Sequence, residues 1–310
     1  MKEFISHKAK NIFGGEYDLV SLQRLFGGAQ KYTYLAKCSN GFSFVIYKWD
    51  KSTTYFDSTN DLEIFCSNSA VLFERNNALM RKYGIMTPKM FYMDKSRKEQ
   101  NYEYAFVEYI DGVDMDFIIA NEPERLPYIV DSLINNINRL HNIKSSAVGQ
   151  LNRMQDNQFN VIDYELENMH RNCLYLQEND SEYETLYIGA ENKAIMIAER
   201  IEKRKEYSFI HSELGPNHVM VDKKNNAYLI DIEGARFYDV EKENSFIKFR
   251  FGDCIIGFKD DLDEDRMQFY HIQHCFGNLR GAIELKQKGY YDMDDVNGMI
   301  DFFHGQFKNL

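Results

Sequence analysis

The first third of the chain is predicted to form short β-strands separated by turns. Residues 19–25 alternate between hydrophobic and polar positions, the pattern of a strand with one buried face. Later runs are rich in aromatic and β-branched residues and occupy positions 31–38, 42–49, 89–93 and 102–110. The Asn40-Gly41 pair lies between two of these runs and favours a tight hairpin turn. The pattern predicts a small, mostly antiparallel sheet.

One helix is predicted within this sheet region, from about residue 67 to residue 83. Hydrophobic residues recur there at seven-residue spacing, as in the pair Val71 and Ala78. Gly84 follows directly and Pro88 lies just beyond it, and both residue types are typical of the end of a helix. The start of the chain is therefore expected to be a sheet that carries one helix.

The pattern changes to helical periodicity after Gly112. One helical face is marked by hydrophobic residues at three- and four-residue spacing, namely Ile129, Leu133, Ile137 and Leu140. A second helix is predicted at about residues 188–204, and a strand–loop–strand–turn–strand segment at 207–231. Helices resume after this segment. The simplest division is into two lobes, residues 1–111 and residues 112–310.

The charge of the chain narrows its possible partners. Among 310 residues there are 37 Lys and Arg against 48 Asp and Glu, which gives a net charge of −11. Nucleic acids and anionic membranes attract basic proteins, so an acidic protein is not expected to bind either.

The distribution of apolar residues and cysteines indicates a location. No apolar run approaches the roughly 18 residues of a membrane span, and the start of the chain has no apolar signal core. The five cysteines form no C-x-x-C pair, which favours buried, reduced thiols. We expect a soluble, cytoplasmic protein without a membrane partner.

The densest group of candidate catalytic residues lies between residues 209 and 234. Two apolar strands frame a loop that holds His211, Glu213 and Asn217. Asp231 ends the strand that returns. Phosphoryl transfer needs such a layout, because one carboxylate orients the attacking hydroxyl while a second, with an amide neighbour, holds Mg²⁺ against the phosphates. The alternative is a β-hairpin whose polar loop residues only satisfy turns.

This segment resembles the catalytic loop of the aminoglycoside phosphotransferase and choline kinase-like family, distant relatives of protein kinases. The loop of that family reads approximately H-G-D-x-x-x-x-N and is followed by a strand that ends in I-D. The matching positions run from His211 to His218 and then through Ile230-Asp231. The resemblance implies an α+β, two-lobed protein-kinase-like fold, with a small antiparallel sheet and one helix in the N-terminal lobe and a mainly helical C-terminal lobe.

The resemblance also implies roles for the residues of this loop. Asp231 matches the Mg²⁺-binding aspartate without adjustment, and His211 shapes the loop beside the catalytic position. Two positions depart from the family pattern: Glu213 replaces the catalytic aspartate, and His218 occupies the position of the metal-binding asparagine. Because Mg²⁺ prefers oxygen ligands, either Asn217 supplies the oxygen or the site binds a metal poorly.

The first lobe supplies further parts of such a site in the family's order. Gly27 and Gly28 lie between two strands, where the family's nucleotide-covering loop lets backbone N–H groups approach the phosphates. Lys48 ends a Val-Ile-Tyr-Lys run that resembles the kinase V-A-I-K strand, so it is expected on the α- and β-phosphates. Glu74 on the next helix would pair with this lysine. The ordinary alternatives are a hairpin turn, a solvated lysine and a surface glutamate.

The resemblance as a whole implies a small-molecule kinase. Glu108 and Ile110 stand where the family's hinge offers backbone hydrogen bonds to the purine. The enzyme would use Mg²⁺ and move the γ-phosphoryl group of ATP or GTP to a hydroxyl of an aminoglycoside-like or other small alcohol. The departures at Glu213 and His218 leave one alternative open, a pseudokinase that binds a nucleotide or a partner without transfer.

Two further clusters have weaker signals. His271, His274 and Cys275 share one helical face and could bind Zn²⁺, although their hydrophobic neighbours favour ordinary packing. The acidic run at residues 260–265 would attract a cationic alcohol near a substrate site, and it is otherwise a solvated face.

Overall fold

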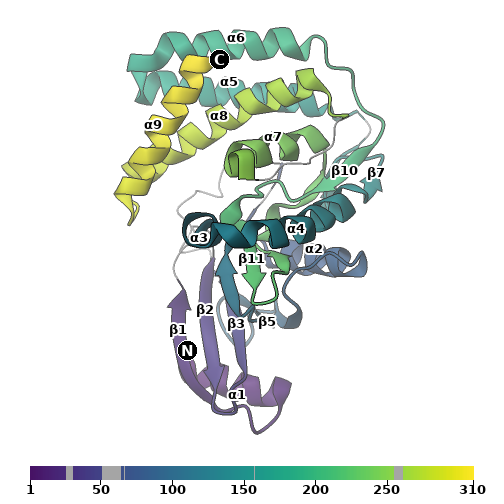
Figure 1. The fold of residues 1–310 in the computed structure, drawn as a ribbon, viewed down its shortest axis with the longest axis vertical. Helices are drawn as coiled ribbons and strands as arrows, with labels where there is room; N and C mark the ends of the chain where they lie inside the picture. The colour runs from purple at the N-terminus through teal and green to yellow at the C-terminus, as the bar shows by residue number, and fades with distance from the viewer. Residues whose placement is uncertain (26–30, 51–63, 66, 157, 255–260) are drawn as a thin grey trace. The chain divides into compact units, whose positions relative to one another are not determined.

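The computed structural model describes residues 1–25, 31–50, 64–65, 67–156, 158–254 and 261–310 of the chain (Figure 1). They form two compact units, each built from several segments. Unit 1 comprises residues 1–143, 149–154 and 216–236, and unit 2 comprises residues 144–148, 155–215 and 237–310. The sequence predicts a nucleotide-binding lobe at residues 1–111 and a helical lobe with the catalytic loop and the substrate site at residues 112–310. The compact units do not test those roles, so the division stays a prediction.

Unit 1 contains a five-stranded antiparallel sheet in the order β1-β2-β3-β5-β4 (Figure 1). Its strands are β1 (Leu19–Leu25), β2 (Tyr32–Cys38), β3 (Ser43–Trp49), β4 (Met90–Asp94) and β5 (Glu103–Glu108). The positions of these strands confirm the predicted sheet. Gly41 has φ 85° in the turn between β2 and β3, a left-handed conformation that glycine adopts without strain.

The predicted helix of this region is α2 (Ala70–Lys82). Ser69 caps its first turn, because the Ser69 hydroxyl accepts a hydrogen bond of 3.3 Å from a backbone N–H of the helix. Gly84, with φ 69°, follows the end of the helix as predicted. The helix faces the sheet through Phe73, whose ring centroid lies 5.3 Å from that of Tyr47 on β3.

A second helix, α1 (Lys2–Phe13), packs on the same sheet, although the sequence analysis predicts no helix there. Ile5 and Ala9 are buried in one hydrophobic cluster with Phe44 and Phe106 of the sheet. The apolar residues of α1 stand between lysines and other polar residues, so the segment resembles a polar terminus. The sheet therefore has a hydrophobic cover on the α1 face as well as on the α2 face.

Unit 1 also contains a three-stranded antiparallel sheet in the order β12-β11-β6. The strands are β6 (Gly112–Asp114), β11 (Val219–Asp222) and β12 (Ala227–Leu229). Gly112 is required at its position, because a Cβ there would lie 1.8 Å from the Val221 carbonyl oxygen. β11 and β12 confirm two strands of the predicted segment, whereas β6 lies where the sequence pattern predicts helix.

Further helices and strands of unit 1 are α3 (Met115–Asn121), α4 (Leu126–His141), β8 (Gly149–Gln150) and β9 (Arg153–Met154). The predicted hydrophobic face of α4 is buried at Ile129, Leu133, Ile137 and Leu140. The Asn136 side chain donates a hydrogen bond of 2.7 Å to the Ala227 carbonyl oxygen and accepts one of 2.9 Å from the Met86 N–H. These bonds join α4 to β12 and to the segment that follows α2.

Unit 2 is mainly helical, as predicted. Its helices are α5 (Val161–Asn179), α6 (Glu184–Ala198), α7 (Val240–Phe251), α8 (Glu264–Gln287) and α9 (Met293–Asn309). Two short strands, β7 (Lys144–Ser145) and β10 (Tyr207–Ile210), form an antiparallel pair, and β13 (Arg236–Tyr238) precedes α7. The helix α6 begins and ends earlier than the helix predicted at 188–204, and α5 is not predicted.

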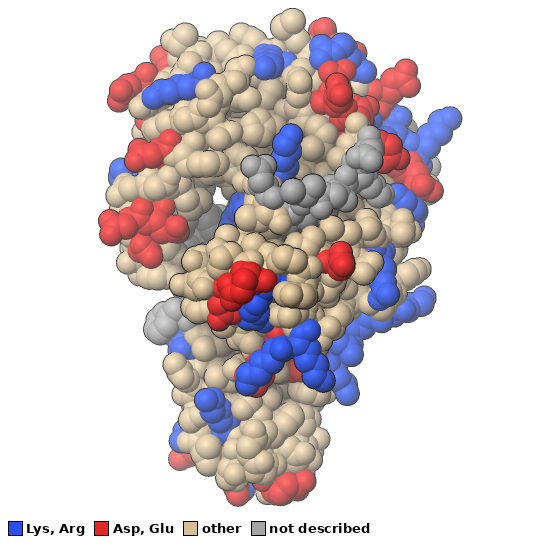
Figure 2. Space-filling model, viewed as in Figure 1, with Lys and Arg blue, Asp and Glu red and all other residues tan. Residues whose placement is uncertain are grey.

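Three general properties of the described residues bear on function. None of their helices has the length and hydropathy to span a membrane. Acidic and basic side chains both occur in small groups over the face shown in Figure 2. Among the described cysteines, Cys38, Cys173 and Cys275 are free and buried, in agreement with the predicted thiols.

Candidate functional site

The predicted catalytic loop begins in unit 2, directly after β10. His211 and Ser212 are buried there. The Ser212 N–H donates a hydrogen bond of 2.9 Å to Oε1 of Glu243 on α7, a residue that is fully buried. Ser212 has φ 81°, in the left-handed region, and stands where the family pattern has glycine. The loop therefore starts from a fixed backbone that is hydrogen-bonded to α7.

Glu213, the predicted catalytic carboxylate, is exposed. It follows the buried pair His211 and Ser212, so an ordered part of the loop carries an accessible carboxylate. Such a carboxylate can accept a proton from a hydroxyl group, the chemistry that the family pattern assigns to this position. The catalytic roles of Glu213 and His211 stay predictions.

The predicted metal ligand Asp231 lies in unit 1, after β12. Its backbone is left-handed, with φ 59° and ψ 46°, and it begins the 3₁₀ turn Ile232–Gly234. Aspartate adopts this conformation more readily than most residues. The Nε2 of His218 lies 3.4 Å from the Asp231 Oδ2, so two of the predicted metal ligands lie together. Asn217, the third, is exposed in the 3₁₀ turn Pro216–His218.

Two residues that the sequence analysis does not single out lie beside Asp231. The ammonium group of Lys31, directly before β2, contacts the Asp231 carboxylate and lies 2.7 Å from the Glu233 Oε1. The side chain of Lys31 is 10% exposed and that of Glu233 is 2% exposed, whereas that of Asp231 is 40% exposed. We call these three residues the Lys31 cluster. One cation is held between a buried carboxylate and a carboxylate open to solvent.

Two elements of unit 1 hold the carboxylates of the Lys31 cluster in place. The indole N–H of Trp49 on β3 donates a hydrogen bond of 3.3 Å to the Glu233 Oε1. The Asn76 amide of α2 donates a bond of 2.7 Å to the Ile232 carbonyl oxygen, which fixes the backbone between the two acids. The sheet and α2 therefore position this cluster jointly.

Burial and charge act in opposite directions on the Lys31 cluster. Burial lowers the pKa of Lys31, but the charges of Asp231 and Glu233 outweigh this effect, so its pKa is raised and the ammonium stays charged. Burial also raises the pKa of Glu233. Among the described residues, the Lys31 ammonium thus contacts both carboxylates, and His218 lies beside the more exposed one.

The donor atoms of the cluster fit Mg²⁺. Both carboxylates lie within reach of a single cation, since the Lys31 ammonium contacts each of them. The Glu233 Oε2 is buried and has no hydrogen-bond partner among the described residues. Among the described residues, no group of three or more His, Cys, Asp or Glu side chains is arranged to hold a metal by itself. Mg²⁺ usually binds one or two carboxylates together with phosphate oxygens and water, which agrees with this arrangement.

The zinc alternative considered for His271, His274 and Cys275 is wrong, because no such metal group occurs among the described residues. The His274 Nε2 is hydrogen-bonded instead to the Lys242 carbonyl oxygen at 2.9 Å. Cys275 is fully buried in α8. These side chains therefore pack within the protein, which is the alternative that the sequence favours.

The predicted ion pair between Lys48 and Glu74 is also wrong. The Lys48 Nζ lies 2.9 Å from the Asp50 Oδ2 and 4.2 Å from the ring centroid of Tyr102. Glu74 contacts the ammonium group of Lys95 instead. Each residue has a different charged partner, and neither belongs to the Lys31 cluster.

The other predicted nucleotide-binding residues are described only in part. Gly27 and Gly28 lie outside the described residues. The Glu108 N–H donates a hydrogen bond of 2.8 Å to the Lys89 carbonyl oxygen, and the Glu108 Oε2 accepts one of 3.0 Å from the Lys89 N–H. The Glu108 N–H is therefore already paired with Lys89, and Ile110 is buried. These bonds do not address the expected backbone contact of Glu108 and Ile110 with a purine. This contact stays a prediction.

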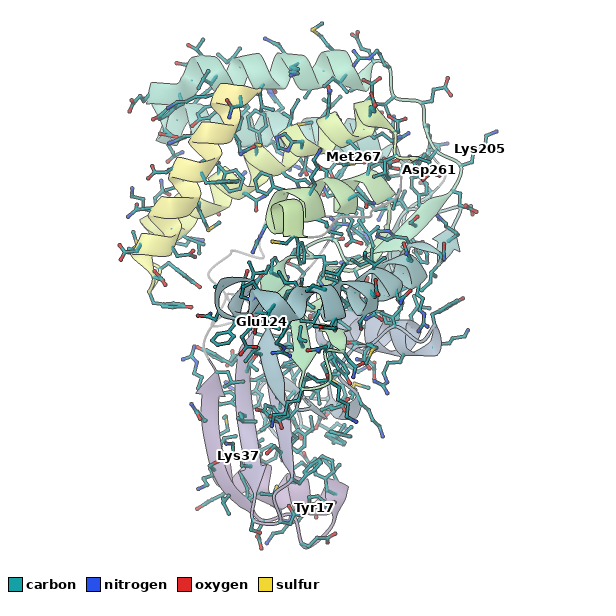
Figure 3. The ribbon with its side chains drawn as sticks, viewed as in Figure 1. Tyr17, Lys37, Glu124, Lys205, Asp261 and Met267 are labelled. Carbon is teal, nitrogen blue, oxygen red and sulfur yellow. The ribbon has the colours of Figure 1, made fainter. Side chains whose placement is uncertain are left out.

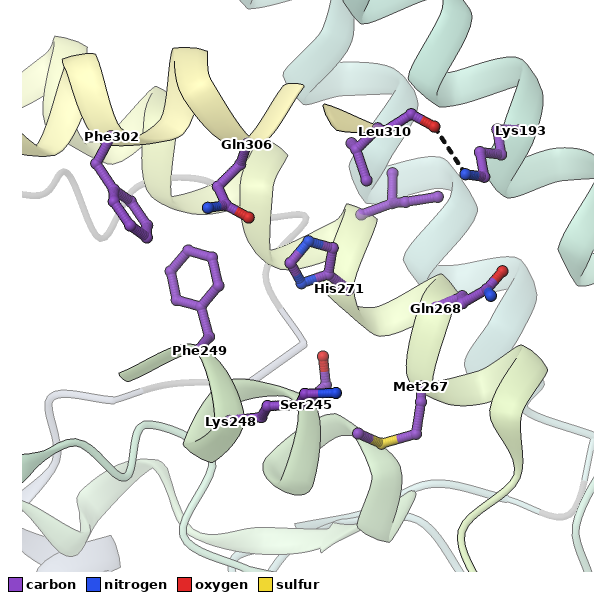
Figure 4. Close-up of a pocket in the computed structure, with 11 residues that line it drawn as sticks. Lys193, Ser245, Lys248, Phe249, Met267, Gln268, His271, Phe302, Gln306 and Leu310 are labelled. Carbon is purple, nitrogen blue, oxygen red and sulfur yellow. Dashed lines mark hydrogen bonds between the residues drawn. The ribbon is translucent and has the colours of Figure 1, made fainter. Parts of the chain in front are cut away.

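Unit 2 contains a cavity of about 420 Å³ between α6, α7, α8 and α9 (Figure 4). Its apolar lining includes Phe249, Met267, Ile272 and Phe302. Among the described residues, the titratable side chains that line it are Lys193, Lys248 and His271, and none of the described lining side chains is an acid. Burial, together with the charges of Lys248 and Lys193, lowers the pKa of His271. These charges favour a neutral or anionic ligand over a cationic one.

The described part of the acidic run, residues 261–265, serves the helix α8 itself, whereas residue 260 lies outside the described residues. Asp263 caps α8 by accepting a hydrogen bond of 2.9 Å from the Arg266 N–H. Asp265, in the first turn, forms an ion pair with Arg200. Asp261 lies ahead of the helix and is exposed (Figure 3). These contacts agree with a solvated face rather than with a substrate site.

Comparisons with known proteins address the family of the chain. Residues 70–243 match the family model described as the phosphotransferase enzyme family. This match covers more than half of the chain and includes the predicted catalytic loop, Asp231 and Glu233. Among curated proteins, none matches the chain significantly.

Solved structures with a similar fold cover nearly the whole chain. A thermostable variant of the aminoglycoside phosphotransferase APH(4)-Ia matches with 15% identity and a TM-score of 0.67, over 98% of this chain and 98% of its own. Choline kinase LicA from Streptococcus pneumoniae matches with 14% identity and a TM-score of 0.65, over 100% of this chain and 99% of its own. These likenesses confirm the predicted fold class, an α+β fold of the protein-kinase-like type.

Proposed function

Because the chain belongs to the phosphotransferase enzyme family, we propose that it transfers the γ-phosphoryl group of ATP or GTP to a hydroxyl group of a small molecule. The family match confirms the resemblance and the predicted enzyme class, a phosphotransferase. The Lys31 cluster carries the proposal. In it Asp231, which stands at the family's metal-binding position and is open to solvent, shares the Lys31 ammonium with the buried Glu233. A structure of APH(4)-Ia in ternary complex with ADP and hygromycin B supports a nucleotide donor.

In the proposed reaction the acceptor oxygen forms a bond to the γ-phosphorus, and the bond from that phosphorus to the β-phosphate oxygen breaks. Glu213 orients the acceptor hydroxyl and takes up its proton, and ADP or GDP leaves. Asp231 and Glu233 would hold Mg²⁺, which when bound offsets the charge of the phosphates. His211 shapes the buried start of the loop.

We place the acceptor in the cavity of unit 2. The helix α7 lines this cavity through Ser245 and Lys248, and the same helix holds the catalytic loop through Glu243. The positive charges of Lys193 and Lys248 disfavour a polycationic aminoglycoside there. They favour a neutral or anionic alcohol with an apolar part. An aminoglycoside-like acceptor is the alternative that the family resemblance supplies.

A coupled assay for ADP or GDP release tests the proposal. The protein is given Mg·ATP or Mg·GTP with neutral sugars, hydroxy acids, choline or aminoglycosides as acceptors. Acceptor-dependent release that Asp231→Asn abolishes supports phosphotransfer. The matched control is Asp261→Asn, the same change at an exposed acid, which should keep the activity. Release with cationic acceptors alone would contradict the placement in the cavity.

A pseudokinase is the second candidate, because Glu213 and His218 depart from the family pattern. Such a protein would show a rise in unfolding temperature with Mg·ATP or Mg·GTP, but no hydrolysis and no acceptor phosphorylation. Nucleotide binding without any product across the acceptor panel would favour this reading over transfer. Either activity is expected in the cytoplasm, where both nucleotides are supplied.

A further inference from the structure

The two faces of the five-stranded sheet receive different side chains from β3. Successive side chains of a strand point to opposite faces, so Tyr47 and Lys48 cannot both face α2. Tyr47 is the residue that does, since its ring centroid lies 5.3 Å from that of Phe73 on α2. Lys48 lies on the other face, 4.2 Å from the ring centroid of Tyr102 and 2.9 Å from the Asp50 carboxylate.

On the face toward α2, the ammonium group belongs to Lys31, which lies directly before β2, the strand next to β3. Tyr32 of β2 is paired with Lys48 of β3 in the antiparallel register, so the residue before it, Lys31, shares the face of Tyr47. The distance from the Lys31 Nζ to the ring centroid of Tyr47 is 5.0 Å. The lysine directly before β2 thus occupies the side of the sheet on which a β3 lysine is expected from the family pattern.

We propose that Lys31, and not Lys48, contacts the phosphates of the nucleotide. Glu233 is its acidic partner, in the place that the sequence analysis gives to Glu74. This proposal rests on the proposed function, because it assumes a triphosphate beside Asp231. The family pattern also pairs an ammonium with a carboxylate. In this chain the ammonium comes from the residue before β2 and the carboxylate from the 3₁₀ turn Ile232–Gly234.

Position and burial support this role. Glu233, which is 2% exposed, holds the ammonium from the protein side, while Asp231, which is 40% exposed, leaves a path from solvent. An ammonium placed in this way can donate a charge-assisted hydrogen bond to a phosphate oxygen. Lys48 would have to leave its ion pair with Asp50 and reach around the sheet to contact the same phosphates.

The test compares Lys31→Met with Lys48→Met, which both remove the charge and keep an unbranched side chain. Calorimetry measures the binding of Mg·ATP and Mg·GTP, and of adenosine and guanosine. Lys31→Met should weaken triphosphate binding about ten- to a hundredfold, because the lost bond is to a phosphate. It should change nucleoside binding by less than about threefold, and Lys48→Met should leave both affinities nearly unchanged.

Lys31→Met removes the ammonium that contacts two carboxylates and could destabilise the protein, so a second variant is needed. Lys31→Met/Tyr47→Lys returns an ammonium to the same face from β3, the strand that supplies it in the family pattern. Recovery of triphosphate binding in this double variant supports the proposal. No recovery in a double variant that circular dichroism shows to be folded would count against it.

Two results would overturn the proposal. One is a loss of triphosphate binding in Lys48→Met with retention in Lys31→Met. The other is an equal loss of triphosphate and nucleoside binding in Lys31→Met. If the unsubstituted protein binds neither Mg·ATP nor Mg·GTP, the proposed function itself fails, and this outcome is distinct from both.

Discussion

Each unit contains a buried lysine beside a carboxylate, and the two sites differ in how far their carboxylates are exposed to solvent. In the Lys31 cluster one ammonium serves two carboxylates, and Asp231 is 40% exposed. In unit 2 the Lys242 Nζ lies 2.6 Å from the Glu165 Oε1, and these side chains are 6% and 2% exposed. Arg266 contacts Asp239 nearby, with exposures of 5% and 0%. We call these four residues of unit 2 the Lys242 cluster.

The Lys242 cluster is enclosed and pairs two cations with two carboxylates, and Arg204 lies 3.5 Å from Asp239 as a further cation. The Tyr238 hydroxyl donates a hydrogen bond of 2.6 Å to Glu165, and the Tyr270 hydroxyl donates one of 2.6 Å to Asp239. These contacts join α5, α7 and α8, and both acids of the cluster are buried. The comparison shows how a structural charge cluster differs from a candidate binding site. In the candidate binding site one carboxylate stays open to solvent, whereas the acids of the Lys242 cluster are enclosed.

The largest expected effect comes from breaking the enclosed cluster. Asp239→Asn removes the buried carboxylate that Arg266 contacts and leaves, among the described residues, only the carboxylate of the more exposed Asp263, 3.8 Å away, so the free energy of unfolding should fall by about 3–5 kcal/mol. Urea unfolding followed by circular dichroism measures this change. A loss below about 1 kcal/mol would contradict the structural role. Mg·nucleotide affinity of the folded fraction should not change.

Changes at Glu213, the exposed carboxylate of the loop, should affect rate and not stability. Glu213→Gln removes the proton acceptor, and Glu213→Asp withdraws it by about 1.5 Å. A misplacement of this order can cost on the order of a hundredfold in rate. Both variants should lower kcat, Glu213→Gln more than Glu213→Asp, with nucleotide affinity retained. Steady-state kinetics decide, and a rise in turnover with Glu213→Asp would favour the pseudokinase.

A pH dependence should arise beside the Lys242 cluster. Burial, with the charge of Lys242, lowers the pKa of His274 from 6.5 to about 3. The unfolded chain takes up this proton below about pH 6.5 and the folded protein does not, so the stability present above that pH is lost as the pH falls. By about pH 5 the loss is roughly 2 kcal/mol. His274→Gln should flatten this slope in urea unfolding, and an unchanged slope would contradict the assignment.

The smallest expected effect is a gain in stability at the loop. Ser212 has φ 81°, and its hydroxyl has no hydrogen-bond partner among the described residues. Ser212→Gly removes the strained Cβ, although glycine also loosens the unfolded chain, so the free energy of unfolding should rise by about 0.5–1 kcal/mol. Thermal unfolding measures this, with Ser212→Ala as the control that keeps the Cβ. A lower stability of Ser212→Gly would show that the hydroxyl contributes more than the backbone.

The strands and most helices could be predicted because hydrophobic periodicity is local, but the face of a residue in β3 could not. The sequence analysis assigns Lys48 to the face that Tyr47 occupies, and a shift of one residue along a strand reverses every side chain. Both faces of β3 carry buried hydrophobic residues, with Phe44 and Ile46 on the α1 face. The unpredicted helix α1 is the reason, because it covers the second face.

The candidate site could be predicted where the motif is contiguous. Asp231 and His218 lie together as predicted, since they stand at the ends of paired strands. Lys31 and Glu233 are 202 residues apart in the chain, and only the tertiary fold brings them into contact. The sequence does contain one local signal for the backbone of the loop. Ser212 stands at a glycine position of the family pattern, and in the structure it adopts a left-handed backbone that is typical of glycine.

The most direct test asks whether Asp231 binds a metal–nucleotide complex. Mn²⁺ replaces Mg²⁺ in the presence of ATP or GTP, and binding of the complex to the protein enhances water-proton relaxation. We predict enhancement with the unsubstituted protein, its loss with Asp231→Asn, and its retention with Asp261→Asn, the same change at an exposed acid before α8. Unchanged enhancement with folded Asp231→Asn would contradict the assignment of the Lys31 cluster to nucleotide binding.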